Sequence, residues 1–148
     1  MIRRRGACEL ILKALFQAEV GRFSADEVLE TVHEAVRTEA EDWTYVQATV
    51  RGVSSDVERL DRIIGFLAEG WRLDRLAKVD KNVLRMALFE LIQHPEFPTQ
   101  TVVNDAIEIA RKYSMEDSGK FVNGILGSFL RRREELLQRA DGVEMGAR

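Results

Sequence analysis

Apolar residues recur at steps of three and four along most of this chain, whereas no segment shows the apolar-polar alternation of a half-buried strand. Because an α-helix turns once in 3.6 residues, these steps place the apolar side chains on one face of a helix. The longest run has its apolar positions at Val46, Val50, Val53, Val57, Leu60, Ile64 and Leu67. The sequence therefore predicts an all-α fold, with a break in this run near Gly52 or Ser54-Ser55.

Helix start and stop signals divide the chain into about seven helices. Ser24 and Glu27 have the spacing of a capping box, and Ser114–Asp117 repeats that pattern before the last helix. Pro95 ends a strongly apolar helix, because the residue before a proline disfavours helical geometry. The expected helices cover residues 7–18, 25–36, 46–67, 73–76, 80–92 and 103–113, with a last one that ends near Leu137.

Length and composition indicate one ordinary globular domain. The chain has 148 residues, of which 45% are hydrophobic and 32% charged, enough to bury a core without disulfides. Its one cysteine, Cys8, allows no internal disulfide, which favours a reducing compartment. No apolar run approaches the roughly 20 residues that span a bilayer, and no signal-peptide pattern is present. We expect a single cytoplasmic domain over residues 1–148, with a mobile basic arm at 1–6 and a polar tail at 139–148.

The charge distribution leaves both ends of the chain open to an anionic partner. The net charge of −3 argues weakly against a nucleic-acid-binding protein. However, residues 22–70 carry 5 basic and 11 acidic side chains, while residues 1–21 carry 4 and 2 and residues 71–148 carry 13 and 12. The acidic side chains are therefore concentrated in a middle block, and distribution bears more on binding than the sum does.

The segment Asp117–Gly124 combines a cation, an aromatic ring and several polar side chains where a helix begins. Phe121 starts the apolar stripe, whereas Lys120 falls on the opposite, solvated side. Together with Arg3-Arg4-Arg5, this grouping is typical of proteins that bind single-stranded RNA through phosphate contacts and stacking. The alternatives are a capped core helix, with Phe121 in the core, and a basic terminus that has no partner.

Four blocks of this sequence resemble the NusB family: Asp80–Leu91, Val103–Glu108, Glu116–Ser118 and Lys120–Gly124. The resemblance extends from the arginine arm to about Arg131, and the last block is the most specific. It implies a NusB-like pair of three-helix bundles with an extra helix, which agrees with the helical pattern.

The resemblance also implies a function in transcription. NusB proteins bind boxA, a short single-stranded RNA element found notably in ribosomal RNA leaders, as a heterodimer with the small-subunit ribosomal protein NusE. The complex joins other Nus factors on RNA polymerase and suppresses premature termination. Two alternatives stay open: a helical RNA-binding module in ribosome maturation, and a module that mainly self-associates as a homodimer.

The expected site residues follow from this resemblance together with the motifs above. Those expected to bind RNA are Arg3, Arg4, Arg5, Arg85, Asp117, Lys120 and Phe121. Those expected to contact NusE are Phe16 and Asp80. Plain structural alternatives exist for three of them: Arg85 as a surface arginine paired with an acid, Asp117 as a helix N-terminal charge, and Asp80 as an N-cap.

Two departures from the family pattern concern the N-terminal helix. Relatives often have arginine where this chain has Cys8, so one expected phosphate contact is missing. Many have tyrosine where this chain has Phe16, so a hydroxyl is missing as well.

Catalysis finds little support in the sequence. The two histidines, His33 and His94, are on different predicted elements, and neither has a cysteine or carboxylate at metal-ligand spacing. Cys8 has no evident partner base. We therefore expect a binding protein that has no enzymatic activity, no metal and no cofactor.

Overall fold

The computed structural model describes residues 5–35, 40–68 and 76–145, and within these ranges it contains eight α-helices and no strand. The all-α prediction is therefore confirmed, with one helix more than the expected seven. The expected short helix at 73–76 lies almost wholly outside the described residues, as do Arg3 and Arg4. The helices are α1 (Arg5–Gly21), α2 (Ala25–Ala35), α3 (Ala40–Ser55), α4 (Val57–Leu67), α5 (Lys78–Gln93), α6 (Thr99–Tyr113), α7 (Ser118–Arg131) and α8 (Arg133–Met145).

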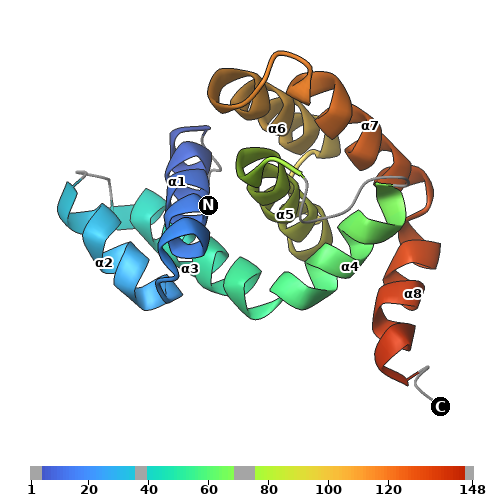
Figure 1. The fold of residues 1–148 in the computed structure, drawn as a ribbon, viewed down its shortest axis with the longest axis horizontal. Helices are drawn as coiled ribbons and strands as arrows, with labels where there is room; N and C mark the ends of the chain where they lie inside the picture. The colour runs from blue at the N-terminus through green and yellow to red at the C-terminus, as the bar shows by residue number, and fades with distance from the viewer. Residues whose placement is uncertain (1–4, 36–39, 69–75, 146–148) are drawn as a thin grey trace.

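The helices form the two expected bundles (Figure 1). The first consists of α1, α2 and α3, which pack against one another, and the second consists of α5, α6 and α7. Helix α4 packs on α5 and α7, and α8 extends from the second bundle along α4. Helix α5 also packs on α1 and α3, so it connects the two bundles.

Local sequence signals explain three of the helix boundaries. The Ser24 hydroxyl accepts a hydrogen bond from the Glu27 N–H at 3.1 Å, while the Glu27 carboxylate accepts one from the Ser24 N–H at 2.9 Å. This is the predicted capping box. The long apolar run breaks between α3 and α4, directly after Ser54-Ser55. Helix α5 ends at Gln93, two residues before Pro95.

The second expected capping box, at Ser114–Asp117, is wrong. Helix α7 begins only at Ser118, and the Asp117 side chain makes no capping hydrogen bond. Instead, the Ser118 hydroxyl accepts a hydrogen bond from the Met115 N–H at 3.3 Å. Ser114–Asp117 has the residue types of a capping box, but the helix begins later because Ser118 is buried and its hydroxyl is bound to Asp80 of α5.

The chain termini also differ from expectation. Arg5 and Gly6, expected in the arm, lie in the first turn of α1. A separate helix, α8, runs to Met145, well past the expected end near Leu137. Its buried Leu136 and Ala140 anchor it, and Asp141 pairs with Arg59 of α4 at 2.8 Å. These tertiary contacts hold a segment whose sequence has a weak apolar stripe.

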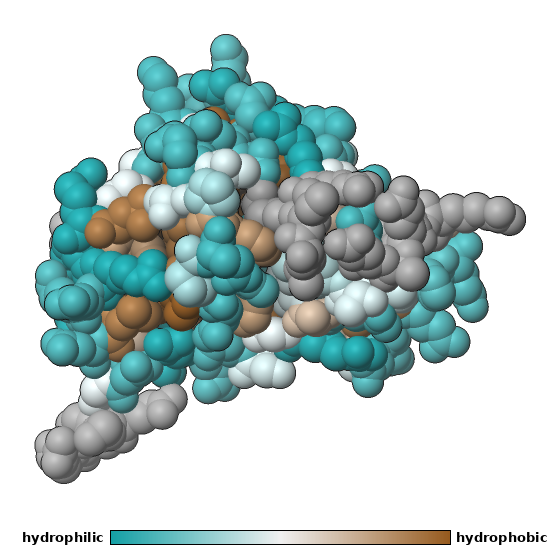
Figure 2. All heavy atoms as spheres, turned by 180° about the vertical axis from the view of Figure 1, so that it is seen from behind, coloured by the Kyte–Doolittle hydropathy of each residue, from teal (hydrophilic) through white to brown (hydrophobic). Residues whose placement is uncertain are grey.

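Helix α5 lies at the centre of the core. Val83, Leu84 and Leu88 are completely buried, and polar side chains of the same helix are buried as well, including Glu90 at 0% and Arg85 at 8% exposed. The rear face of the molecule is largely hydrophilic, and its hydrophobic side chains gather on the half that holds α4 to α8 (Figure 2). Among the described residues, no helix has the length and apolar character needed to cross a membrane.

Candidate functional site

The base of the arginine arm is fixed to α6. Arg5 donates two hydrogen bonds to Oδ1 of Asp105, from Nε at 3.1 Å and from Nη2 at 2.9 Å. Half of the Arg5 side chain remains exposed, whereas the Asp105 side chain is only 12% exposed. Arg5 is thus held in place by Asp105 although half of its side chain is open to solvent. The position of Asp105 was not foreseen, because the two residues lie 100 positions apart in sequence.

A second link between α1 and α6 lies one turn further along α1. Glu9 accepts hydrogen bonds from the Lys112 ammonium, at 3.0 Å, and from the Tyr113 hydroxyl. The hydrogen bond from the Tyr113 hydroxyl lowers the pKa of Glu9 below its usual value, and Lys112 adds to this effect. Partial burial of the carboxylate acts in the opposite direction but is outweighed. Lys112 itself is 60% exposed. Asp105 and Lys112 are seven residues apart, so they share the face of α6 that points to α1.

The first turn of α7 presents Lys120 and Phe121. Lys120 is exposed, and Phe121 is partly buried against the core. Asp117, directly before the helix, is also exposed. The partial exposure of Phe121 leaves part of its ring available, while its remaining surface serves the core. These three residues therefore lie within about one helical turn, and their expected role in binding RNA stays a prediction.

Arg111 joins this group, although no sequence motif indicated it. Its side chain lies directly over Gly119, where an added Cβ would come within 2.8 Å of the Arg111 Nε. The guanidinium also reaches Glu108 at 3.2 Å, and the side chain is 58% exposed. The signal that could have found it is the basic pair Arg111-Lys112 at the end of α6, close in sequence to a glycine in the next helix.

An open hollow of about 480 Å³ lies between the starts of α5 and α7. Its lining residues are Leu76, Ala77, Asp80, Met115, Asp117, Ser118 and Phe121. Asp80 is 9% exposed, and its Oδ2 accepts a hydrogen bond from the Ser118 hydroxyl at 3.0 Å. The α5 N-cap is Ala77, so the plain N-cap interpretation of Asp80 is wrong. Its expected contact with a protein partner stays a prediction.

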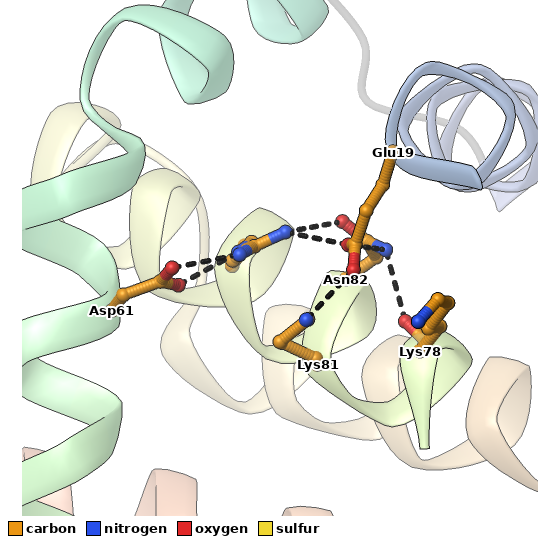
Figure 3. A network of polar contacts seen from close by, with 6 residues as sticks. Glu19, Asp61, Lys78, Lys81 and Asn82 are labelled. Carbon is orange, nitrogen blue, oxygen red and sulfur yellow. Dashed lines mark hydrogen bonds and ion pairs between the residues drawn. The ribbon is translucent and has the colours of Figure 1, made fainter. Parts of the chain in front are cut away.

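Arg85 lies in a buried ion-pair network that connects α1, α4 and α5 (Figure 3). It donates to both carboxylate oxygens of Asp61 at 2.7 Å and to Glu19 at 2.9 Å. Lys81 pairs with the other oxygen of Glu19 at 2.7 Å. Burial opposes the ionised form of Glu19, but hydrogen bonds from Lys81 and Asn82 outweigh it and lower the pKa of Glu19.

The Arg85 geometry matches the alternative of an arginine paired with an acid, except that the pair is buried. Its side chain is 10% exposed and its guanidinium is bound to two carboxylates, so an RNA phosphate would have to displace them. The RNA contact expected of Arg85 therefore stays a prediction. Phe16 is partly buried on α1, and Cys8 is fully buried in the core.

The histidines have structural surroundings. His33 stacks on Trp43 with ring centroids 4.4 Å apart, and His94 stacks on Phe97 at 4.6 Å. Within the part of the chain that the structure describes, no cluster of three or more histidine, cysteine or acidic residues could hold a metal ion.

Comparisons with known proteins agree with the fold and the motifs. The model of the NusB family matches residues 5–131. The transcription antitermination protein NusB of Desulforudis audaxviator (strain MP104C) is 43% identical over 134 residues, which cover 90% of this chain and 97% of that protein.

Two solved structures have the same fold. The T. maritima NusB structure has a TM-score of 0.78 at 35% identity, covering 86% of this chain and 89% of that one. A crystal structure of the antitermination factors NusB and NusE in complex with dsRNA also has a TM-score of 0.78, at 28% identity, covering 86% of this chain and 96% of that chain.

Proposed function

This chain belongs to the NusB family, and on that premise we propose that it is a transcription antitermination factor that binds boxA RNA together with NusE. In this proposal the RNA element lies in nascent transcripts, notably those of ribosomal RNA. The complex then joins other Nus factors on RNA polymerase and suppresses premature termination. The solved relative that contains NusB, NusE and RNA supports both partners.

The observation that carries the proposal is the grouping of Lys120, Arg111 and the partly exposed Phe121 at the start of α7. Two exposed cations beside an aromatic ring suit the binding of single-stranded RNA, because the cations can neutralise its phosphates while one of its bases stacks on the ring.

Helix α6 connects this group with the arginine arm. Arg5 is bound at Asp105, and Lys112 lies two turns further on the same face, roughly 10 Å away at 1.5 Å per residue. A single strand that follows α6 would therefore meet cations at both ends of its path. We assign phosphate contacts to Arg3, Arg4 and Arg5 at one end and to Lys120 at the other.

We assign the NusE surface to the side of α1 that carries Phe16. The Phe16 ring is partly buried, so its packing holds it in place while its exposed part can form an apolar contact with NusE. The hydroxyl that many relatives have at this position is absent, and the contact here is correspondingly apolar. We also assign Asp80, in the first turn of α5, to contact with NusE.

The test is fluorescence anisotropy of a labelled boxA RNA and a scrambled RNA, each with and without NusE. We expect boxA to bind more tightly, and NusE to increase that preference. Lys120→Ala should weaken binding, whereas Arg51→Ala is the matched control, because Arg51 is an exposed cation on α3 of the first bundle. Equal, weak and salt-sensitive binding of both RNAs would favour the generic RNA-binding module instead.

A further inference from the structure

Three consecutive arginines, Arg131, Arg132 and Arg133, lie where α7 meets α8. Arg131 is exposed, and the other two are partly exposed. Arg132 forms an ion pair with Glu135 at 2.9 Å. Within the part of the chain that the structure describes, neither Arg131 nor Arg133 forms an ion pair with a carboxylate. Two of the three guanidinium charges therefore have no paired acid among those residues.

Arg131 shares a face of α7 with Lys120, because the two residues are about three helical turns apart. The Arg131 guanidinium folds back along the helix. It donates a hydrogen bond to the Ser128 hydroxyl at 3.1 Å, and its Nη1 would lie 3.4 Å from a Cβ added at Gly127. From Gly127 back to Lys120 the helix spans roughly 10 Å at 1.5 Å per residue. The two cations are therefore close enough to contact the same stretch of a bound chain.

The surface of α7 between these two cations suits a phosphate chain. Residues 121–130 contain no acidic side chain. Asn123 and Gly124 are exposed, and no atom of the described residues lies within 4 Å of a Cβ added at Gly124. Helix α7 leads away from α1 to the junction with α8 (Figure 1). A strand that reaches Lys120 from α6 therefore has an open path without negative charge along α7 to Arg131.

Helix stability explains only part of this positive charge. A cation in the last turn of a helix interacts favourably with the helix dipole, which accounts for Arg131. Arg133, however, is the first residue of α8, where the dipole disfavours a cation. Its one aromatic contact that the structure describes is with the Phe129 ring, whose centre is 5.7 Å from Cζ of Arg133. An anionic partner would explain both arginines, because a guanidinium binds a phosphate through two parallel hydrogen bonds.

We propose that Arg131 and Arg133 bind phosphates of the RNA that flanks boxA, and that α7 guides the strand from Lys120 to the α8 junction. This inference rests on the proposed function and extends the RNA surface beyond the boxA element. Because phosphate contacts carry no base specificity, the site responds to the length of the RNA and not to its sequence. The shared face with Lys120 favours RNA over an acidic protein segment as the occupant.

The experiment varies the length of the RNA. A labelled boxA RNA is compared with the same RNA extended by a short run of uridines at its 5′ end or at its 3′ end. Anisotropy with NusE present measures the affinity at several salt concentrations. Extension at one end should tighten binding, and the slope of log affinity against log salt concentration should steepen by about 1.4, which is about 0.7 for each of two phosphates. The gain in affinity should therefore grow about 25-fold for a tenfold decrease in salt concentration.

The protein side of the experiment uses the double variant Arg131→Ala/Arg133→Ala, with Arg51→Ala as the control for the loss of an exposed cation. The alanine double variant should bind the short boxA RNA as the wild type does and should gain nothing from extension. The double variant Arg131→Lys/Arg133→Lys keeps both charges and should retain most of the gain. Thermal melting of each variant measures any effect on the fold. The wild-type series needs no variant to fold, so it tests the site by itself.

Three outcomes would overturn the site. The first is no gain from extension at either end, which would favour an acidic protein segment as the partner. The second is a gain that persists in the alanine double variant. The third is an equal loss of the gain and of thermal stability in the alanine and lysine double variants, which would make the arginines structural. Equal binding of short boxA and scrambled RNAs would instead overturn the proposed function. That comparison uses no extended RNA, so the two failures are distinguishable.

Discussion

Arg85 donates one hydrogen bond of 2.7 Å to each carboxylate oxygen of Asp61, and this bidentate pair joins α5 to α4. The same guanidinium holds Glu19 of α1. One side chain therefore fixes three helices that belong to different parts of the fold. The network has two acids and two cations, Arg85 and Lys81, so its charges balance only while all four are present.

Arg85→Ala should be strongly destabilising, because it leaves Asp61 without its partner in a largely buried site. We expect a loss of about 3 kcal/mol in the free energy of unfolding, the scale for breaking a buried ion pair. Chemical denaturation followed by circular dichroism measures it. Arg51→Ala, whose pair with Asp26 is exposed, should change stability by less than about 0.5 kcal/mol. A folded Arg85→Ala protein that is stable but has lost RNA binding would return Arg85 to the RNA interface.

Glu19 should make the protein less stable in acid. Its pKa is lowered in the folded state, from a usual value of 4.5, because hydrogen bonds from Lys81 and Asn82 overcome the effect of burial. Folding therefore favours the ionised form. The stabilisation is present above pH 4.5 and is lost as the pH falls through the lower folded-state pKa.

Urea denaturation at several pH values between 3 and 6 measures this dependence. Glu19→Gln should be less stable than the wild type at pH 6, and the difference should shrink towards pH 3 as the wild-type carboxylate is protonated. A difference that is independent of pH would show that ionisation of Glu19 is not what stabilises the network.

Local patterns predicted the parts of this fold that depend on neighbours in sequence. The Ser24–Glu27 capping box and the break before Asp56 need only a few adjacent residues, and both were found where the sequence placed them. The cluster of Lys120 with Phe121 is likewise contained in one helical turn. These features follow from the periodicity of a helix and from the donors left open at its first turn.

Contacts between distant segments were not predictable in the same way. Arg85 was assigned to a surface, but its partners lie 24 and 66 positions away, and their approach depends on how α1 and α4 pack on α5. The Ser118–Asp80 bond spans 38 positions, so no local pattern indicated that Ser118 would donate to the Asp80 carboxylate. Helix α8 was missed because its anchors, Leu136 and Ala140, are few and its partner α4 is remote.

Arg5→Ala should weaken binding of every RNA, because a phosphate contact carries no base specificity. The slope of log affinity against log salt concentration should become shallower by about 0.7, the value for one phosphate on a single strand. Anisotropy titrations at four salt concentrations measure it. Arg51→Ala should leave the slope unchanged. An unchanged slope in Arg5→Ala would mean that Asp105 keeps the guanidinium from the RNA.

Phe121→Ala should reduce boxA affinity by about 1–3 kcal/mol, the range for removing one base-stacking ring. The ring is only partly buried, so the helical content should be retained. Phe129→Ala in the same helix is the control: Phe129 is completely buried, and its loss should cost about 3–5 kcal/mol of stability. If the two variants lose stability equally, the alternative of a core role for Phe121 is correct.

Gly119→Ala should weaken RNA binding without removing any charge. The added methyl group would come within 2.8 Å of the Arg111 Nε and 3.0 Å of its Cγ, so the Arg111 side chain has to move away from α7. Gly119 is in the first turn of α7 and alanine favours a helix over glycine, so the variant should stay folded once the Arg111 side chain has moved.

Affinity for boxA should fall severalfold in both Gly119→Ala and Arg111→Ala. The double variant should lose little more than either single one, because both substitutions remove the same contact. A double-mutant cycle measured by anisotropy, with thermal melting of each variant, carries the test. Additive losses would show that Gly119 affects the RNA surface by some route other than the position of Arg111.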